Sequence, residues 1–385
     1  PDVEFRAREA MMLRMKTGAM LIAVLGLLLT GCGDAAKTAG TAVQNEPATV
    51  FKWKLVTTWP KNYPGLGLGP ENFAKLVERM SNGRMQVKVY GGNELVPPFE
   101  VFDAVSRGTA EMGHGGAYYW KGKSPATTFF STLPFGMTAQ ETNAWLHYGG
   151  GMELWRELYA RFNLVPLAGG NTGVQMAGWF NKEIKTPDDL KGLKMRIPGL
   201  GGEVMTRLGA TAVSLPGSEI YTSMQTGVID ATEWVGPYND MALGLHEVAK
   251  YYYYPGWHEP GPNLEFIVNK QAFDSLPDDL QAIVESAART INGDMLDEYT
   301  ARNNRALQDL VNNHGVQLRA LPDEVLRAMY RATLDVLRDT AASDDITRRS
   351  YESYWNFRND VMAYHRISEQ AYLNARTMVE EPAGE

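Results

Sequence analysis

Arg196 lies at a position where the end of a β-strand could hold it close to a bound anion. In Leu193-Lys-Met-Arg196-Ile-Pro198, the apolar side chains alternate with Arg196, which therefore faces the other way at the carboxyl end of an expected strand. Ligands of open α/β sheets bind just beyond the carboxyl ends of strands, and a guanidinium there can hold a carboxylate through two parallel hydrogen bonds. From spacing alone, a solvated arginine at a strand end is an equally good interpretation.

An acidic residue closes a second apolar run. Val228-Ile-Asp-Ala-Thr-Glu233 leads into a carboxylate that is followed directly by Trp234. A carboxylate at a buried strand end requires a cation, a metal ion or a proton. A binding role for Glu233 and a structural salt bridge are therefore both open.

Two further residues supply oxygen atoms for a possible ion site. Gln175 is the polar member of an alternating apolar run at residues 174–180, and Glu259 follows an aromatic stretch at residues 251–257. Together with a backbone carbonyl, Gln and Glu oxygens suit a hard cation such as Na⁺ or Ca²⁺ rather than zinc. The six histidines show no metal-ligand spacing, and we expect most of them at the surface or in helix caps.

Composition and motifs exclude several classes of function. The length of 385 residues favours two globular domains. The net charge of −8 provides no basic surface for nucleic acid or anionic membranes. Its single cysteine can form neither an internal disulfide nor a cysteine metal site. The catalytic signatures HExxH, CxxC and GxSxG do not occur in the sequence.

The first residues have the pattern of an export signal. Arg14 and Lys16 precede an uncharged run at residues 17–29 that is too short to span a bilayer, and Leu29-Thr-Gly-Cys32 resembles a lipobox. We interpret residues 1–31 as a signal peptide, Cys32 as a lipidated residue and residues 33–50 as a flexible tether. The mature protein would then be periplasmic and held at the membrane by its lipid. An ordinary signal peptide with a chance cysteine is the alternative.

From Phe51 onwards, short β-like runs alternate with helical segments, which indicates an α/β architecture. We expect strands at residues 53–58, 85–90, 174–180, 193–197, 211–215, 228–229 and 266–269, with a Gly-rich strand end at 112–119. We expect helices at residues 71–80, 101–107, 138–162, 188–190, 202–208 and 218–225, and almost entirely helix from residue 278.

The last helical segment carries a broad apolar stripe. Residues 346–378 contain no obvious break, so we expect one unusually long helix. It would either brace both domains or act as a dimerisation arm, and its Tyr and Trp residues favour a contact surface.

Several stretches together resemble a known family. Thr186-Pro-Asp-Asp-Leu-Lys-Gly-Leu-Lys-Met-Arg196 and the run from Arg207 through Pro216 and Glu219 to Glu233-Trp234 resemble the signature of TRAP-transporter solute-binding proteins. These proteins are the extracytoplasmic receptors of tripartite ATP-independent transporters. The resemblance extends from about Trp53 to the C-terminus. Gly170-Asn-Thr-Gly-Val-Gln175-Met, with Glu233-Trp234, is similar to the DctP-like branch that binds 2-oxo acids and lactate with a metal ion.

The resemblance implies a fold and a function. The fold is a type II-like, two-lobed (Venus-flytrap) α/β binding protein with a long C-terminal helix. Domain I would comprise residues 51–171 and 265–320, domain II residues 172–264, and residues 321–385 would form helices for bracing or dimerisation. The protein would be no enzyme but a receptor that passes a small 2-oxo or 2-hydroxy monocarboxylate, such as pyruvate, 2-oxobutyrate or lactate, to TRAP membrane subunits.

The resemblance also implies roles for individual residues. Arg196 would hold the ligand carboxylate, Tyr118 and Tyr119 would close over the ligand, and Gln175 and Glu259 would also belong to the substrate-binding residues. A ligand-bridging Na⁺ or Ca²⁺ ion would be held by Gln175, Glu233, the backbone oxygen of Trp234, and Glu259. Relatives in this branch can form homodimers through the C-terminal helix.

Three other functions are open from the sequence. A second cation lining the cleft would favour a dicarboxylate or a sugar acid as the ligand. An exported, metal-assisted enzyme would use Glu233 as a base, although a nucleophile and a histidine dyad are not evident. A surface-anchored adhesion protein would bind no small acid.

Overall fold

The computed structural model describes residues 49–379. The interpreted signal peptide, Cys32 and most of the tether lie outside the described residues, as do residues 380–385 at the C-terminus. None of the helices in the described part of the chain is long and apolar enough to cross a bilayer.

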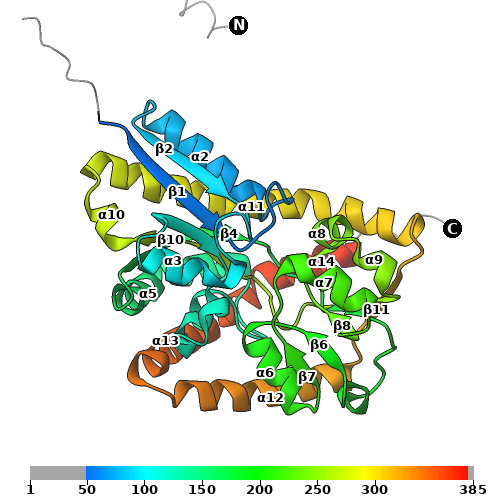
Figure 1. The fold of residues 1–385 in the computed structure, drawn as a ribbon. Coiled ribbons are helices and arrows are strands. Elements are labelled where there is room, and N and C mark those ends of the chain that lie inside the picture. The colour runs from blue at the N-terminus through cyan, green and yellow to red at the C-terminus, as the bar shows by residue number, and fades with distance from the viewer. Residues whose placement is uncertain (1–48, 380–385) are drawn as a thin grey trace, which may run out of the picture. The chain divides into compact units, whose positions relative to one another are not determined.

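The described residues form two mixed β-sheets (Figure 1). The first has the strand order β2-β1-β3-β10-β4, and the second has the order β11-β9-β5-β8-β6-β7. The strands of the first sheet are β1 (Phe51–Thr57), β2 (Met85–Tyr90), β3 (Met112–Gly115), β4 (Leu164–Asn171) and β10 (Asn263–Asn269). Those of the second sheet are β5 (Gly178–Phe180), β6 (Lys194–Arg196), β7 (Thr211–Val213), β8 (Ala231–Thr232), β9 (Tyr251–Tyr254) and β11 (Gln317–Ala320).

We call each sheet, with the helices and loops between its strands, a lobe. The chain passes from the first lobe to the second at residues 172–177, between β4 and β5, and returns at residues 255–262, between β9 and β10. These two crossing segments lie side by side, because the backbone N–H of Gln175 donates to the backbone carbonyl of Glu259 at 3.1 Å. All of the second lobe except β11 is therefore inserted into the first.

Helices cover both sheets. In the first lobe these are α2 (Leu68–Met80), α3 (Val101–Ser106), α4 (Ala139–Tyr148), α5 (Gly151–Ala160) and α10 (Lys270–Asp274), with short 3₁₀ helices η1 (Pro98–Glu100), η2 (Ala117–Trp120) and η3 (Pro125–Phe130). In the second lobe they are η4 (Pro187–Leu190), α6 (Gly199–Arg207), α7 (Gly217–Gln225), α8 (Pro237–Ala242) and α9 (Leu245–Val248).

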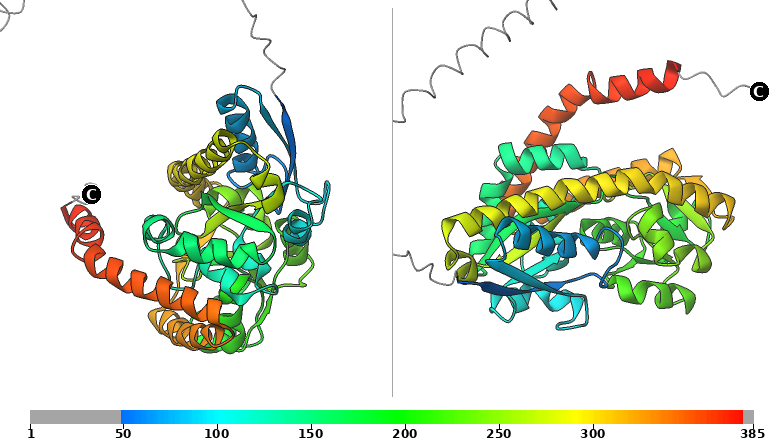
Figure 2. Two further views of the ribbon diagram at one scale, coloured as in Figure 1. Left: turned by 90° about the vertical axis from the view of Figure 1, so that its left-hand side faces the viewer. Right: turned by 90° about the horizontal axis from the view of Figure 1, so that it is seen from above.

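One helix runs across both lobes. α11 (Asp278–Asn312) has 35 residues and packs on α2 and β4 of the first lobe and on α8 of the second (Figure 2). It then leads into β11, which pairs with β9 in the second sheet. β11 thus joins the second sheet, although its residues fall within 265–320, the stretch that the sequence analysis assigned to the first domain.

The C-terminal helices differ from the expectation of one unbroken helix. α12 (Asp323–Ala341) packs on α6 of the second lobe, and α13 (Asp345–His365) packs on α4, α5 and η3 of the first. α13 ends at His365, and α14 (Glu369–Val379) follows after a turn. The turn comes directly after the contact of His365 Nδ1 with Glu141 Oε1 of α4 (2.6 Å), so the single helix expected at 346–378 is wrong. Neither glycine nor proline occurs at this turn, so no local breaker residue signals it.

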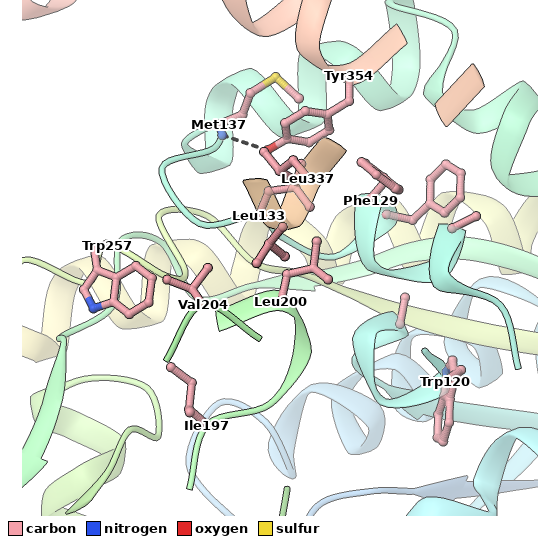
Figure 3. Packing of buried hydrophobic residues seen from close by; sticks show 14 of the residues in the cluster. Trp120, Phe129, Leu133, Met137, Ile197, Leu200, Val204, Trp257, Leu337 and Tyr354 are labelled. Carbon is pink, nitrogen blue, oxygen red and sulfur yellow. Dashed lines mark hydrogen bonds between the residues drawn. The ribbon is translucent and has the colours of Figure 1, made fainter. Parts of the chain in front are cut away.

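An apolar core joins the lobes to these helices (Figure 3). Leu133 of the first lobe and Leu200 and Val204 of the second belong to one buried cluster, which also includes Leu337 of α12 and Tyr354 of α13. The Tyr354 hydroxyl accepts a hydrogen bond from the Met137 amide at 2.8 Å. Because its members come from both lobes, this core stabilises their contact.

Several expected elements are shorter or were missed. The strand expected at 174–180 covers only Gly178–Phe180, and Val174 is 58% exposed instead of facing a core. The strand expected at 228–229 lies at Ala231–Thr232, and the helix expected at 138–162 is split into α4 and α5 at Gly150, whose φ is +88°. β4 was missed because Pro166 and two glycines resemble a loop, but β4 is an edge strand, where proline is tolerated.

Candidate functional site

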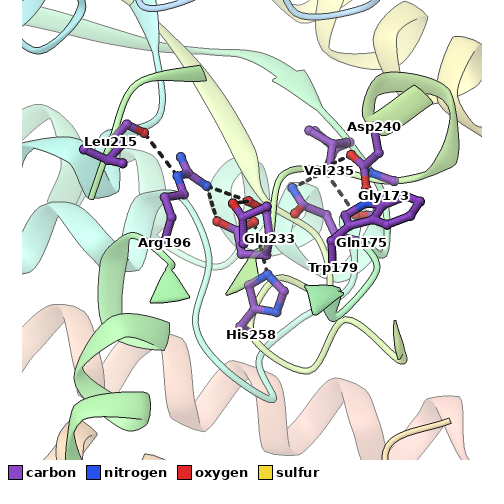
Figure 4. A network of polar contacts seen from close by, with 12 residues as sticks. Gly173, Gln175, Trp179, Arg196, Leu215, Glu233, Val235, Asp240 and His258 are labelled. Atoms are coloured by element: carbon purple, nitrogen blue, oxygen red, sulfur yellow. Dashed lines mark hydrogen bonds and ion pairs between the residues drawn. The ribbon is translucent and has the colours of Figure 1, made fainter. Parts of the chain in front are cut away.

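The site lies where the two crossing segments meet the carboxyl ends of β6 and β8 (Figure 4). β6 and β8 are parallel neighbours, with Arg196 opposite Thr232, so Arg196 and Glu233 emerge side by side at one edge of the second sheet. Each is only 1% exposed. This burial excludes the alternative of a solvated strand-end arginine.

Most of the Arg196 guanidinium is hydrogen-bonded. Its Nη1 donates to both the backbone oxygen and the Oε1 atom of Glu233, and its Nε donates to the Leu215 carbonyl at 3.1 Å. Its Nη2 donates to the Tyr119 hydroxyl at 3.3 Å, and the guanidinium lies 5.1 Å from the centre of the Trp234 ring. Glu233 therefore forms a salt bridge with Arg196, which was one of the two interpretations of this residue. The Nη2 atom of Arg196 makes only the long hydrogen bond to Tyr119.

A histidine that the sequence analysis did not select completes the surroundings of Glu233. His258 Nε2 lies 3.3 Å from Glu233 Oε2, and both residues are buried. His258, Glu233 and Glu259 form a group whose possible ligand atoms lie within 4.8 Å of one another. His114 is also buried, between Trp59 and the Gly169 carbonyl. The general expectation of surface histidines is thus wrong for these two, since sequence spacing does not reveal which loops turn inward.

Two buried oxygen atoms at the crossing segments have no partner. Gln175 Oε1 and Glu259 Oε2 form no hydrogen bond within the described residues, nor does His258 Nδ1. The backbone oxygen of Trp234 accepts no backbone hydrogen bond there either. Burial, followed by the charge of Glu233, raises the pKa of Glu259 well above its ordinary value. Buried polar atoms without partners need an explanation, and a bound ion is one.

The donor set fits a hard cation. Gln175, Glu233, Glu259 and the Trp234 carbonyl all supply oxygen, the ligand type that Na⁺ and Ca²⁺ prefer. With both carboxyl groups ionised, the charges of Arg196, Glu233 and Glu259 sum to −1 in a buried space, so a cation would also restore charge balance. The residues present are therefore suited to hold the ion that the sequence analysis expected.

The first lobe contributes two tyrosines to this edge. Tyr118 and Tyr119 lie on η2, directly after β3, and their rings pack edge to face at 4.7 Å between centroids. Burial raises the pKa of Tyr119 to about 12, so its hydroxyl keeps its proton at neutral pH. A cavity of about 200 Å³ lies between these tyrosines and the turn from β6 to α6.

The structure thus brings all of the selected residues together. Arg196, Glu233 and Trp234 come from the second sheet, Gln175 and Glu259 from the two crossing segments, and Tyr118 and Tyr119 from the first lobe. Gln175 was expected on a strand, but it lies in a crossing segment. Glu259 was expected after an aromatic loop, of which residues Tyr251–Tyr254 form β9.

The fold places the buried Arg196 and a set of buried oxygen atoms between two lobes, and the comparisons identify the family. The model of the bacterial extracellular solute-binding proteins of family 7, DctP, matches residues 55–344. The chain belongs to this family of TRAP solute-binding proteins.

Individual relatives are similar over most of their length. The chain is 46% identical over 323 residues to the monocarboxylate 2-oxoacid-binding periplasmic protein of Nostoc sp., which covers 84% of this chain and 88% of that protein. A TRAP periplasmic solute-binding protein of Pseudoalteromonas atlantica, solved with sodium and pyruvate, is 44% identical with a TM-score of 0.83, covering 85% of this chain and 99% of that one.

A third relative was solved as a dimer. The TRAP solute-binding protein of Bordetella bronchiseptica is 38% identical with a TM-score of 0.84, covering 86% of this chain and 98% of that one. One of its sites holds calcium and picolinate, and the other is an apo site. The expected two-lobed architecture and membership of the TRAP family are thereby confirmed.

Proposed function

We propose that this protein is the receptor of a TRAP transporter for a small 2-oxo or 2-hydroxy monocarboxylate, of which pyruvate is the reference ligand. The observation that carries the proposal is the placement of the buried Arg196 cation beside the unpartnered oxygens of Gln175 and Glu259. The monocarboxylate 2-oxoacid-binding relative and the relative solved with pyruvate and sodium support it.

The residues divide the work of binding. Arg196 Nη2 turns from Tyr119 towards the ligand carboxylate, which gains a charge-assisted hydrogen bond in a site without water. Gln175, Glu233, Glu259 and the Trp234 carbonyl would hold Na⁺ or Ca²⁺, which would supply positive charge for the oxygen atoms of the ligand. Tyr118 and Tyr119 cover the ligand from the first lobe and exclude solvent.

This arrangement performs binding and release without chemistry on the ligand. A small monocarboxylate buries too little apolar area for tight binding, so a directed charge contact must supply most of the affinity. Contact between the lobes then produces a surface that membrane subunits can distinguish from the open protein. We further propose that the mature chain stays in the periplasm, anchored through Cys32.

The last helix supports a homodimer. α14 contacts α13. Tyr372 on α14 is 64% exposed, and Ile367, in the turn before α14, is 78% exposed. Met378 is exposed as well. Exposed apolar side chains on one projecting helix are typical of an interface between copies, and the Bordetella relative was solved as a dimer.

The test is a thermal-shift and calorimetric titration of purified protein. We expect pyruvate to raise the melting temperature in the presence of Ca²⁺ or Na⁺, and we expect the shift to disappear after chelation and exchange into potassium buffer. Succinate and a sugar acid test the alternative ligands. Turnover of pyruvate, followed by NMR, would contradict a receptor function, and no shift with any acid would favour the adhesion alternative.

Arg196→Ala is the central variant. We expect it to abolish the shift with pyruvate, because the carboxylate loses its cation. It should also lower the stability of the free protein by about 3–5 kcal/mol, because Glu233 stays buried without its partner. Arg207→Ala is the matched control, since Arg207 pairs with Asp339 at the surface. If folded Arg196→Ala protein binds pyruvate normally, the anchor is assigned to the wrong residue.

A further inference from the structure

A tyrosine of the first lobe reaches across to the segment that carries two of the proposed ion ligands. Tyr63 lies in the loop after β1, and its hydroxyl donates to the Asn239 carbonyl at the start of α8 at 2.5 Å. The same hydroxyl accepts a hydrogen bond from Trp234 Nε1 at 3.2 Å. All three residues are buried. One hydroxyl therefore joins the first lobe to both ends of residues 234–239.

Asn239 makes a second set of bonds to the first lobe and to α11. Its Nδ2 donates to the Pro64 carbonyl at 2.9 Å, and its Oδ1 accepts from the Tyr299 hydroxyl at 2.7 Å. The side chain is completely buried, with both of its polar atoms paired. Separating the lobes at this point would leave buried polar groups to be rehydrated or left unpaired, so these hydrogen bonds favour the arrangement of the lobes seen here.

The neighbouring residue fixes the same segment within the second lobe (Figure 4). Asp240 Oδ1 accepts from the amides of Val235 and Gly236, each at 3.0 Å. Its Oδ2 accepts from Trp179 Nε1 at 2.9 Å and from the Tyr252 hydroxyl at 2.7 Å. These four donors tie residues 235–240 to β5 and β9 of the second sheet.

We propose that Tyr63 is a positioning residue that acts through Trp234: its hydroxyl holds the closed lobes together and fixes the tryptophan whose backbone oxygen is a proposed ion ligand. Tyr63 is not itself a proposed ligand of the ion or of the carboxylate, and its two hydrogen bonds join the first lobe to the second. The choice of pyruvate as the probe rests on the proposed function. Removing the hydroxyl should therefore accelerate opening and ligand release without slowing encounter.

The conservative variant separates the hydroxyl from the ring. Tyr63→Phe keeps the edge-to-face packing on Trp234, whose centroid lies 6.3 Å away, and removes both hydrogen bonds of the hydroxyl. Tyr238→Phe is the matched control: Tyr238 lies on α8, and the variant loses the hydrogen bond that its hydroxyl donates to Glu298 of α11 at 3.1 Å. That contact does not involve Trp234.

The experiment is stopped-flow binding of pyruvate with saturating Ca²⁺ to wild type and to both variants. For Tyr63→Phe we expect the dissociation rate to rise about tenfold, from the loss of two buried hydrogen bonds, while the association rate stays within about twofold. Tyr238→Phe should leave both rates within about twofold of wild type. An unchanged dissociation rate in folded Tyr63→Phe protein would overturn the proposal.

A ligand-free measurement decides the case in which the proposed function fails. If wild type does not bind pyruvate, the proposed function is wrong, and hydrogen exchange of the free proteins tests Tyr63 by itself. We expect faster exchange in Tyr63→Phe at residues 58–67 and 233–240, and unchanged exchange there in Tyr238→Phe. Equal protection of both segments in wild type and Tyr63→Phe would also overturn the proposal.

Discussion

Arg196 and Glu233 are costly residues for this protein to bury. Taking both charges out of water carries a desolvation penalty that their attraction often only offsets, so a buried pair is weak support for stability. Here Glu259 and the unpartnered oxygen of Gln175 also lie near the pair. A salt bridge that served stability alone would not need these additional buried polar groups. We therefore attribute the pair to ligand binding rather than to the stability of the fold.

A second buried carboxyl, Glu265 on β10, gives a pH prediction. Its oxygens contact Trp120 Nε1 at 2.5 Å and the Tyr159 hydroxyl at 2.8 Å, and no basic group is among these partners. Burial raises its pKa from 4.5 to about 8, although the two hydrogen bonds counteract part of the rise. Between these values the folded carboxyl keeps a proton that the unfolded chain has lost, so Glu265 destabilises the protein increasingly as the pH rises.

Glu265→Gln keeps the shape and removes the titration. We expect the melting temperature of the variant, relative to wild type, to increase from pH 5 to pH 8 and to change little above about pH 8. Calorimetry of both ligand-free proteins across this range measures the difference. Parallel curves for the two proteins would show that Glu265 does not titrate in this window.

For individual residues, the sequence indicated which residue types could bind a ligand, but it did not indicate which other side chains surround them. Arg196 and Glu233 could be selected because each ends an apolar run, and the parallel pairing of β6 and β8 explains why they meet. His258, Tyr63 and Asp240 carried no such signal. Their importance comes from contacts between parts of the chain far apart in sequence, which one unaligned sequence does not reveal.

Among the elements, those with strong local patterns were predicted well and those defined by long-range pairing were not. The helical period of α2 and the alternation of β2 were visible in the sequence. β4 and β9 were not, since β4 contains Pro166 and glycines, and the four tyrosines of β9 become a strand only by pairing with β5 and β11. The domain boundaries drawn from the sequence stay a prediction.

The α14 element yields a prediction about assembly. Ile367→Asp, in the turn before α14, combined with Tyr372→Asp on α14 places two charges at exposed apolar positions, and we expect the variant to elute as a monomer where wild type is a dimer. Light scattering coupled to size-exclusion chromatography measures this. Pyruvate affinity should stay within about twofold, because none of the proposed site residues lies on α14 or in the turn before it. A monomeric wild type, or a variant that remains dimeric, would contradict a role for α14 in dimerisation.

Across the whole molecule, contacts between the lobes differ in how much they contribute to the free energy of lobe closure. Lys121 at the end of η2 pairs with Glu203 on α6, but their side chains are 35% and 50% exposed, and exposed ion pairs contribute about 0–1 kcal/mol. Lys121→Ala should therefore weaken pyruvate binding by less than about threefold, and the effect should fade in concentrated KCl. Calorimetry at low and high KCl checks both statements. A loss as large as that expected for Tyr63→Phe would show that the surface pair dominates closure.

The insertion of the second lobe between two crossing segments has a consequence for chimeric receptors. An exchange of residues 178–254 between relatives would carry Arg196 and Glu233 into the new protein, whereas Gln175 and Glu259 would stay with the recipient. In such a hybrid, the arginine proposed to bind the carboxylate would come from one parent, and two of the proposed ion ligands would come from the other. Recombination at these two junctions could therefore alter which acid is recognised while the requirement for a metal ion is retained.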